Sequence, residues 1–350
     1  MHITKTNFII NFLVLTFAAG NFDSVATAAD QIQMVSGARL DGDIVGASPT
    51  EVSIDVRGSK RNIPVNEIRQ VTFAEDPPEL TAGRARVIVR KPENGLAELK
   101  KINPTSIERE IVKRDLQFYL AYATGKVALS SGGDKAKAMQ AMLAFVRAAP
   151  TSFHFFDAAE LLGDLSLANG DYEQAGKYYG AISSKAPWPE YKMRAMMSEA
   201  KALIAQDDFT RAAAKYDAIL SLKSDSKEAR RQKTFAQIGK ARCIAETGSP
   251  DEGIAMLEKI IAENDAADTE LFGRAYNAMG DCQRKAGKTK EALMAYLHVD
   301  ILFYAEPELH AQSLYHLSKL WADVKNSDRA AAARTLLNDR YSGSIWASKP

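Results

Sequence analysis

The feature that most constrains the fold is a block of residues that recurs along most of the chain. In its clearest copy, Gly163 is followed by a turn at Gly170 and Asp171 and then by Ala175 and Tyr179. Six copies place their second small residue at positions 138, 175, 212, 253, 292 and 332, which are 37, 37, 41, 39 and 40 residues apart. Apolar residues between the turns recur with helical spacing. One pair of helices cannot bury its apolar face alone, so the repeat predicts a stack of antiparallel helix pairs.

The spacing of small residues also points to a family. Measured from Gly163, the small positions and turns match the tetratricopeptide-repeat pattern, and Gly280, Ala292 and Tyr296 repeat it. The chain therefore resembles the tetratricopeptide-repeat family over residues 105–347. The resemblance implies a mainly α protein, an α-solenoid of antiparallel helix pairs. Its repeats exceed the usual length of about 34 residues, which implies longer helices or loops.

A short segment ahead of the repeats has the pattern of a β structure. Val52, Ile54 and Val56 alternate with polar residues, as a strand with one buried face requires. Five such strands within residues 30–75 predict a small all-β, barrel-like domain, closed so that no strand edge is exposed. It resembles the short SH3-like or Sm-like barrels of exported bacterial proteins, and we expect a structural or docking module rather than a nucleic-acid binder. Residues 76–104 are expected to form a linker and a partial helical cap.

The first 28 residues have the pattern of a cleavable signal peptide. Lys5 precedes an apolar run over residues 8–19, and Ala26-Thr27-Ala28 supplies a small-x-small cleavage site. The run is shorter than the roughly 20 apolar residues that span a bilayer. We therefore expect a periplasmic or secreted protein with no transmembrane segment after cleavage. The alternative is an uncleaved anchor or a buried helix.

Composition and motifs argue against several classes of function. Hydrophobic residues make up 46% and charged residues 25%, as in soluble globular proteins, and 45 basic against 44 acidic residues give a charge of +1 that favours no nucleic-acid partner. No HExxH, GxSxG or GxGxxG motif occurs. Ala286–Thr289 ends like a phosphate-binding loop, but Cys282 stands where that loop needs glycine. His310 and His316 are six apart, which does not align two metal ligands on a helix. We expect no enzyme activity, catalytic residue, cofactor or metal.

The remaining candidate for function is a groove along the repeats. In the resembled family, defined positions of each first helix face a concave surface. Carried over one by one, these positions are Asp157, Glu160, Asp164, Arg194, Lys201, Arg242, Arg274, Asn277, Asp281 and Arg284. The groove would change from acidic to basic along its length, and its guanidinium, ammonium and amide donors could hold a peptide carboxylate or acidic segment. The candidate groove residues are Arg194, Lys201, Arg242, Arg274, Asn277 and Arg284. The alternative is that they are ordinary solvated helix charges.

Two further points stay open at this stage. Cys243 and Cys282 are either two buried thiols or, in an oxidising compartment, a disulfide. For function, we expect a non-enzymatic scaffold that binds a protein or peptide partner in the bacterial periplasm or cell envelope. One alternative is a structural, self-associating component of an envelope assembly, with homo-oligomers. The other is a hydrolase with a dispersed site.

Overall fold

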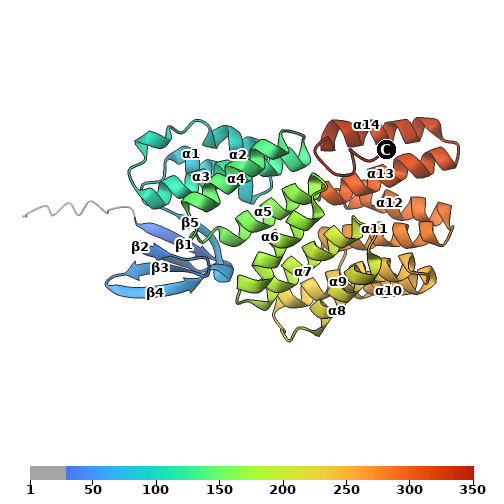
Figure 1. The fold of residues 1–350 in the computed structure, drawn as a ribbon, viewed down its shortest axis with the longest axis horizontal. Helices are drawn as coiled ribbons and strands as arrows, with labels where there is room; N and C mark the ends of the chain where they lie inside the picture. Colours follow the sequence, from blue (N-terminus) through green and yellow to red (C-terminus); the bar gives the residue numbers. More distant parts are fainter. Residues whose placement is uncertain (1–28) are drawn as a thin grey trace, which may run out of the picture.

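The computed structural model describes residues 29–350, so the predicted signal peptide, residues 1–28, lies outside the described residues. A small β-sheet module comes first, and a long array of helices follows it (Figure 1). This arrangement is the fold class predicted from the sequence. Within the described residues, no helix combines the length and the apolar character needed to cross a membrane.

The β module is one antiparallel sheet in the order β4-β3-β2-β1-β5. Its strands are β1 (Asp30–Met34), β2 (Arg39–Ala47), β3 (Glu51–Val56), β4 (Ser59–Pro64) and β5 (Ile68–Thr72). The short 3-10 helix η1 (Val65–Glu67) leads from β4 to β5 at the opposite edge. Among the described residues, these two edge strands do not pair with each other, so the closed barrel that we predicted does not form. The reason lies in β4, whose first four residues are exposed and offer no apolar face to fold over the other strands.

The helices begin directly after the sheet. α1 (Pro78–Ile88) and α2 (Pro92–Leu99) occupy the segment expected as a linker and partial cap, and the 3-10 helix η2 (Pro104–Ser106) follows. The other helices of residues 29–350 form six successive pairs. These are α3 (Glu110–Ser130) with α4 (Lys135–Ala148), α5 (Phe155–Ala168) with α6 (Tyr172–Lys185), α7 (Pro189–Ile204) with α8 (Phe209–Ser221), α9 (Lys227–Glu246) with α10 (Pro250–Glu263), α11 (Thr269–Lys285) with α12 (Thr289–Leu302), and α13 (Pro307–Asp323) with α14 (Ser327–Tyr341).

Local chemistry explains where the helices start. Several second helices begin at an acidic or amide cap: the side chains of Asp134, Asp171 and Asp208 each accept a hydrogen bond from the backbone N–H three residues later. Such caps satisfy N–H groups that the first helical turn leaves without partners. Other helices begin with proline, as at Pro189 and Pro307, where its missing N–H costs no hydrogen bond. The turns recognised in the sequence are therefore the sites where helices begin.

The small residues of the repeat lie where two helices cross closely. A Cβ added to Gly163 would lie 2.3 Å from the ring of Tyr179, and one added to Gly280 would lie 2.5 Å from the ring of Tyr296. Both rings belong to the second helix of the same pair and are almost fully buried. Any larger residue at either glycine would push the helices of that pair apart.

The register predicted for the last repeat is off by one residue. The predicted second small position, Ala332, is exposed, whereas its neighbour Ala333 packs against the apolar cluster around Leu337, which is fully buried. The other predicted positions, 138, 175, 212, 253 and 292, are all buried. Residues 330–333 are four consecutive alanines, so their sequence does not show which of them faces the core.

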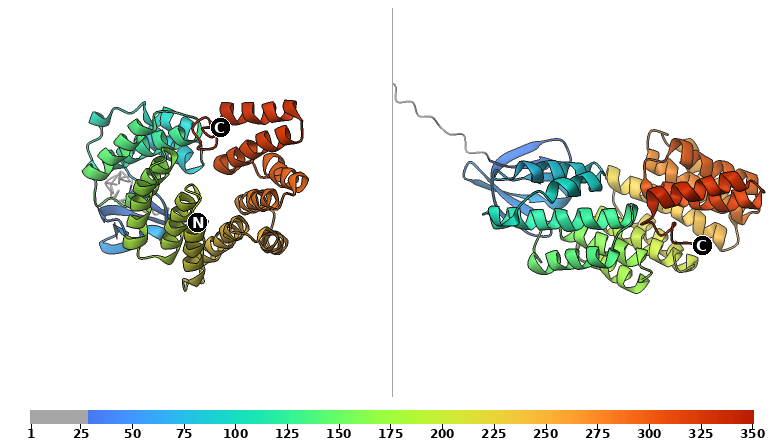
Figure 2. Two further views of the ribbon diagram at one scale, coloured as in Figure 1. Left: turned by 45° about the vertical axis from the view of Figure 1, so that its right-hand side comes forward. Right: turned by 90° about the horizontal axis from the view of Figure 1, so that it is seen from above.

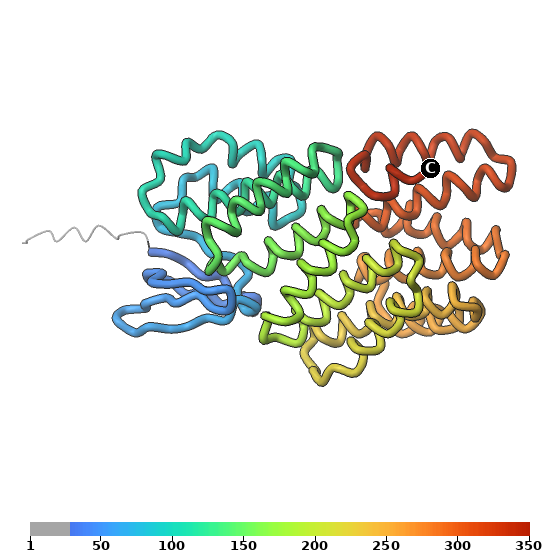
Figure 3. The backbone as a smooth tube through the Cα atoms, in the orientation of Figure 1, coloured from blue at the N-terminus to red at the C-terminus, as the bar shows by residue number. Residues whose placement is uncertain are grey.

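The array curves so far that its two ends meet. After α13 and α14, the residues that follow α14 reach the turn between α3 and α4 (Figure 2), and the smooth trace in Figure 3 shows the same circuit. The hydroxyl of Ser342 donates a hydrogen bond to the backbone oxygen of Ser131 at 2.7 Å, and Arg90 forms an ion pair with Glu306. The helices thus form a closed circuit, and we call this arrangement the ring.

Candidate binding surface inside the ring

The first helices of the pairs form the inner wall of the ring. α7 contacts α9, α9 contacts α11 and α11 contacts α13, so these helices lie side by side. Lys201 on α7 lies within electrostatic range of Arg274 on α11 and Glu308 on α13. Side chains from distant repeats therefore face one shared space, as the groove prediction requires.

The acidic residues of α5 are largely neutralised within the chain. Nε of Arg194 lies 3.2 Å from Oε2 of Glu160, and Nη2 of Arg194 lies 3.7 Å from Asp157. Nζ of Lys126 lies 3.5 Å from Asp164, which also accepts a 2.9 Å hydrogen bond from the hydroxyl of Tyr179. Burial raises the pKa of Glu160, and the positive charge of Arg194 opposes that rise. Arg194, a predicted groove residue, is thus engaged with the chain's own carboxylates.

The predicted groove residue Arg242 is also paired with a carboxylate of the chain itself. Nε of Arg242 lies 2.9 Å from Oδ2 of Asp281, and the hydroxyl of Tyr296 donates a 2.6 Å hydrogen bond to the other oxygen. Asp281 is only 1% exposed. Burial opposes its ionisation, but the positive charge of Arg242 outweighs this and holds the pKa of Asp281 below its ordinary value. Arg242 therefore stabilises a buried carboxylate.

Arg274, Asn277 and Arg284 differ in how accessible their side chains are to a partner. Arg274 forms an ion pair with Glu270 at 2.8 Å. Asn277 is buried and its amide donates a 2.9 Å hydrogen bond to the backbone oxygen of Leu309. Arg284 is partly exposed and lies 3.6 Å from Glu246. Asn277 and Arg284 thus join α11 to its neighbours, whereas the pair of Arg274 with Glu270 lies within α11.

Lys201 differs from the other predicted groove cations, because no carboxylate among residues 29–350 lies within 4 Å of its ammonium group. It is exposed to the space inside the ring. The surrounding protein removes part of its hydration and, together with Arg274, lowers the pKa of Lys201. Of the predicted groove cations, Lys201 is the one best placed to meet a partner.

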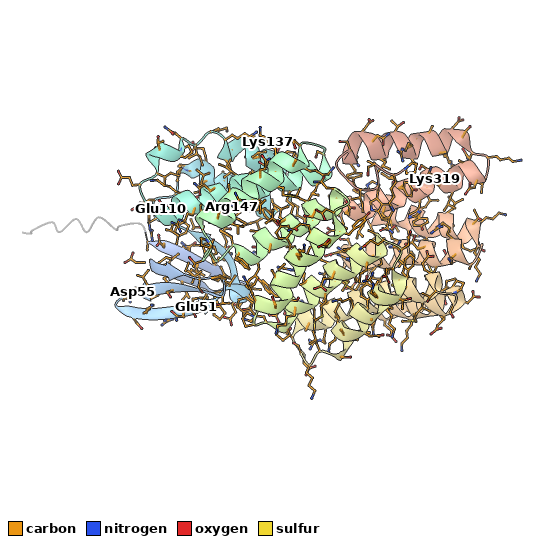
Figure 4. The ribbon with its side chains drawn as sticks, in the orientation of Figure 1. Glu51, Asp55, Glu110, Lys137, Arg147 and Lys319 are labelled. Atoms are coloured by element: carbon orange, nitrogen blue, oxygen red, sulfur yellow. The ribbon has the colours of Figure 1, made fainter. Side chains whose placement is uncertain are left out.

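A cavity of about 720 Å³ opens on the same inner wall. Its lining includes four cationic side chains, three rings and three carboxylates: Arg242, Arg284, Lys319 and Lys349; Tyr315, His316 and Trp346; and Asp207, Glu246 and Asp323. Lys319 lies on α13 (Figure 4), is exposed, and has no ion-pair partner among the described residues. A surface that combines cations with aromatic rings can bind carboxylates and apolar side chains of a polypeptide.

Sequence reasoning missed the contribution of the C-terminus to this cavity. Trp346 and Lys349 come from the segment after α14, and their place depends on how far the array curves. The aromatic stretch at residues 341–346 was the one visible sign that the end of the chain packs against something.

A second polar cluster, also missed, joins the β module to the helices. Arg84 is fully buried and its guanidinium lies 2.7 Å from Asp76 and 2.6 Å from Asp115. Nε2 of His154 lies 2.8 Å from the other oxygen of Asp115. Burial opposes the ionisation of Asp115, but Arg84 and His154 hold its pKa below the ordinary value. Beside it, both oxygens of Asp30 in β1 accept hydrogen bonds at 2.6 Å from Arg109.

This cluster has the features of a structural joint. Its charged groups are hydrogen-bonded to one another. Beside the cluster lies a smaller cavity of about 300 Å³, whose lining includes Glu110, Arg114 and His154. The hydroxyl oxygen of Ser152 accepts a hydrogen bond from the backbone N–H of His154, whereas the ring of His154 contacts Asp115. Across residues 29–350, no group of three or more histidine, cysteine, aspartate or glutamate side chains is arranged to hold a metal ion. Cys243 and Cys282 are free and buried.

The fold and the inner wall define an α-solenoid of helix pairs, and its repeats have the tetratricopeptide-repeat fold. A tetratricopeptide repeat protein from Parabacteroides merdae matches 75% of this chain and 91% of its own length, with a TM-score of 0.52 and 17% identity. PilF of Pseudomonas aeruginosa matches 67% of this chain and 96% of its own, with a TM-score of 0.38 and 17% identity. A Rap protein complexed with competence and sporulation factor matches 77% and 76%, with a TM-score of 0.47 and 12% identity. No protein-family model and no curated protein sequence matches the chain. At such low identity, the first similarity shows the fold alone.

Proposed function

We propose that this protein is an exported, non-enzymatic scaffold whose ring of tetratricopeptide-type repeats binds a protein or peptide partner in the bacterial periplasm or cell envelope. The observation that carries the proposal is the inner wall. Among residues 29–350, Lys201 and Lys319 form no ion pair; Lys201 lies near side chains of α11 and α13, and Lys319 lines the aromatic cavity.

The charge pattern of the inner wall supports a polypeptide partner with carboxylates. The acidic residues of α5 are neutralised by Arg194 and Lys126, whereas no carboxylate among residues 29–350 lies within 4 Å of the ammonium groups of Lys201 and Lys319. An acidic segment of a partner would supply the missing counterions and would gain charge-assisted hydrogen bonds.

Export rests on the sequence of residues 1–28. The test is cell fractionation followed by mass determination of the mature chain. We expect the protein in the envelope fraction with a new N-terminus near Ala29, because Ala26-Thr27-Ala28 fits the cleavage site. A full-length chain in the cytosol would refute export.

Binding is tested by proximity labelling in native cells, followed by co-purification of the labelled proteins with variant chains. We expect Lys201→Glu/Lys319→Glu to lose the labelled partner. Lys137→Glu is the matched control, because Lys137 is an exposed lysine on α4, a second helix (Figure 4). Equal recovery of the partner by both variants would refute binding at the inner wall.

Self-association through the β module is the competing function. β4 is an exposed edge strand with unpaired backbone groups that another copy could meet. Its charged residues Lys60 and Arg61 oppose such pairing between identical strands. Light scattering coupled to size exclusion separates the two: a monomer supports the scaffold, and a stable homopolymer supports self-association.

A further inference from the structure

The residues after α14 form a segment that touches two separate parts of the ring. We call residues 342–350 the C-terminal strap. Its first residues meet the turn between α3 and α4: the hydroxyl of Ser342 donates to the backbone oxygen of Ser131 at 2.7 Å, and the N–H of Gly343 donates to that of Ser130 at 3.4 Å. We call this contact the seam.

The seam requires two glycines. Gly132 has a φ of +86°, which side chains rarely adopt. A Cβ added to Gly343 would lie 2.4 Å from the backbone oxygen of Ala128, so only glycine fits there. The two ends of the array thus meet through closely fitted backbone.

The rest of the strap forms part of the wall of the cavity, through Trp346 and Lys349. The ring centroid of Trp346 lies 5.6 Å from that of Tyr315 and 5.4 Å from that of His316, and Trp346 is 8% exposed. The hydroxyl of Ser344 donates to Glu308 at 3.0 Å. Arg334 donates to the backbone oxygens of Ala347 and Lys349 at 3.2 and 2.9 Å.

The strap therefore supplies part of the surface that a partner in the cavity would contact. Among residues 29–350, the ion pair of Arg90 with Glu306 also links the two ends of the array, and Arg90 is 60% exposed. An exposed pair of this kind stabilises little. The strap supplies the closely packed part of this closure.

We propose that the C-terminal strap couples occupancy of the cavity to opening of the ring. This coupling rests on the proposed function: the acidic segment of the partner that enters the cavity displaces Trp346 from the cavity wall. The strap then has fewer contacts to hold it, the seam at Ser342 and Gly343 separates, and the two ends of the array move apart. Coupling of this kind is reciprocal, so a closed seam also holds Trp346 in place.

The test uses the full chain with a reversible lock at the seam. A Cβ built on Gly132 lies 3.5 Å from Cβ of Ser342, within the range for a disulfide, so Gly132→Cys/Ser342→Cys can be bridged. The native thiols of Cys243 and Cys282 are buried and do not compete. Because Gly132 has a positive φ, the single variant Gly132→Cys controls for backbone strain.

The readout is hydrogen exchange of backbone amides in the strap. We expect oxidation of the double variant to slow exchange at residues 346 and 347 at least 5-fold relative to its reduced form, with no change in the single variant. Equal exchange in oxidised and reduced forms would overturn the coupling, because the cavity end of the strap would then move independently of the seam.

A second experiment adds the strap as a separate peptide, residues 342–350. A tethered segment has an effective concentration on the order of millimolar. We expect a chain ending at Tyr341 to bind the peptide about 10- to 100-fold more tightly than the full chain does. Truncation at Tyr341 should speed exchange at residues 130–132, because the contacts of Ser342 and Gly343 with Ser131 and Ser130 are lost. Equal binding by both chains, or unchanged exchange at residues 130–132 on truncation, would overturn the proposal.

Discussion

Arg242 and Asp281 form an ion pair between consecutive first helices, with Nε and Oδ2 2.9 Å apart. Asp281 is almost completely buried, and its second oxygen accepts a hydrogen bond from Tyr296. Arg242 was predicted to contact a partner in the groove, but in the structure it links α9 to α11. This relationship sets how groove variants must be designed, because loss of binding could follow from loss of structure.

Arg242→Ala should lower the free energy of unfolding by about 3 kcal/mol. That is the lower end of the range for breaking a buried pair, and it applies because Arg242 is 21% exposed. The loss arises because Asp281 stays buried without its counterion. Urea unfolding followed by circular dichroism measures it. The double variant Arg242→Ala/Asp281→Asn removes the stranded charge and should recover part of the loss; no recovery would contradict the pairing.

The stability of the protein should fall as the pH is lowered from 6.5 toward 4. Burial lowers the pKa of His316 from its ordinary 6.5 to about 4, so in this window the unfolded chain binds a proton that the folded chain does not. The contribution is present in full above pH 6.5 and is lost by up to about 1.4 kcal/mol per pH unit below it. The contribution of Asp281, whose pKa is lowered from 3.8, is lost only at still lower pH.

Urea unfolding at pH 7, 6 and 5 measures this slope. His316→Gln cannot titrate and is the control, so the difference between the two chains isolates His316 from the other histidines. Parallel pH profiles for the two chains would show that His316 titrates normally in the folded state.

Gly163→Ala should destabilise the protein by about 1–3 kcal/mol, the usual cost of overpacking a core. The added methyl group would lie 2.3 Å from the ring of Tyr179, which is buried and has no room to move. The matched control is Gly176→Ala on α6, where a Cβ meets nothing within 4 Å. That change should stabilise the helix by up to about 1 kcal/mol. Thermal unfolding of both variants gives the comparison, and similar midpoints would argue against close packing at Gly163.

Arg84→Leu should cost about 3–5 kcal/mol, because it leaves the carboxylates of Asp76 and Asp115 buried without a cation. Arg86→Ala, two residues away on the same helix, removes a half-exposed pair with Glu98 and should cost less than about 1 kcal/mol. Limited proteolysis adds a local readout: we expect cleavage between the β module and α3 in the first variant only. Equal protease resistance would show that the joint does not depend on Arg84.

The parts of the fold that local sequence controls were predictable. Helix pairs, capped turns and the buried positions 138 to 292 follow from residues within one repeat, so they were visible without a structure. The last repeat was misplaced by one residue because four alanines in a row hide the face of α14. The openness of the sheet depends on the polar face of β4, which the alternation pattern alone did not reveal.

The site was less predictable because it depends on distant contacts. The sequence indicated which first-helix charges face inward, but not that Arg194, Arg242 and Arg274 are paired with the chain's own carboxylates. The ring closes because the curvature of the array accumulates over six helix pairs. The position of Trp346 at the inner wall therefore could not be derived from any one repeat.

The most direct test of a binding surface inside the ring is a photo-reactive residue placed at position 201 in the native cell, compared with the same residue at position 137. Lys201 faces the enclosed space and Lys137 lies exposed on α4. We expect illumination to yield a discrete adduct with one partner from position 201 and none from position 137. No adduct at position 201, or the same adduct from both positions, would contradict a partner held within the ring.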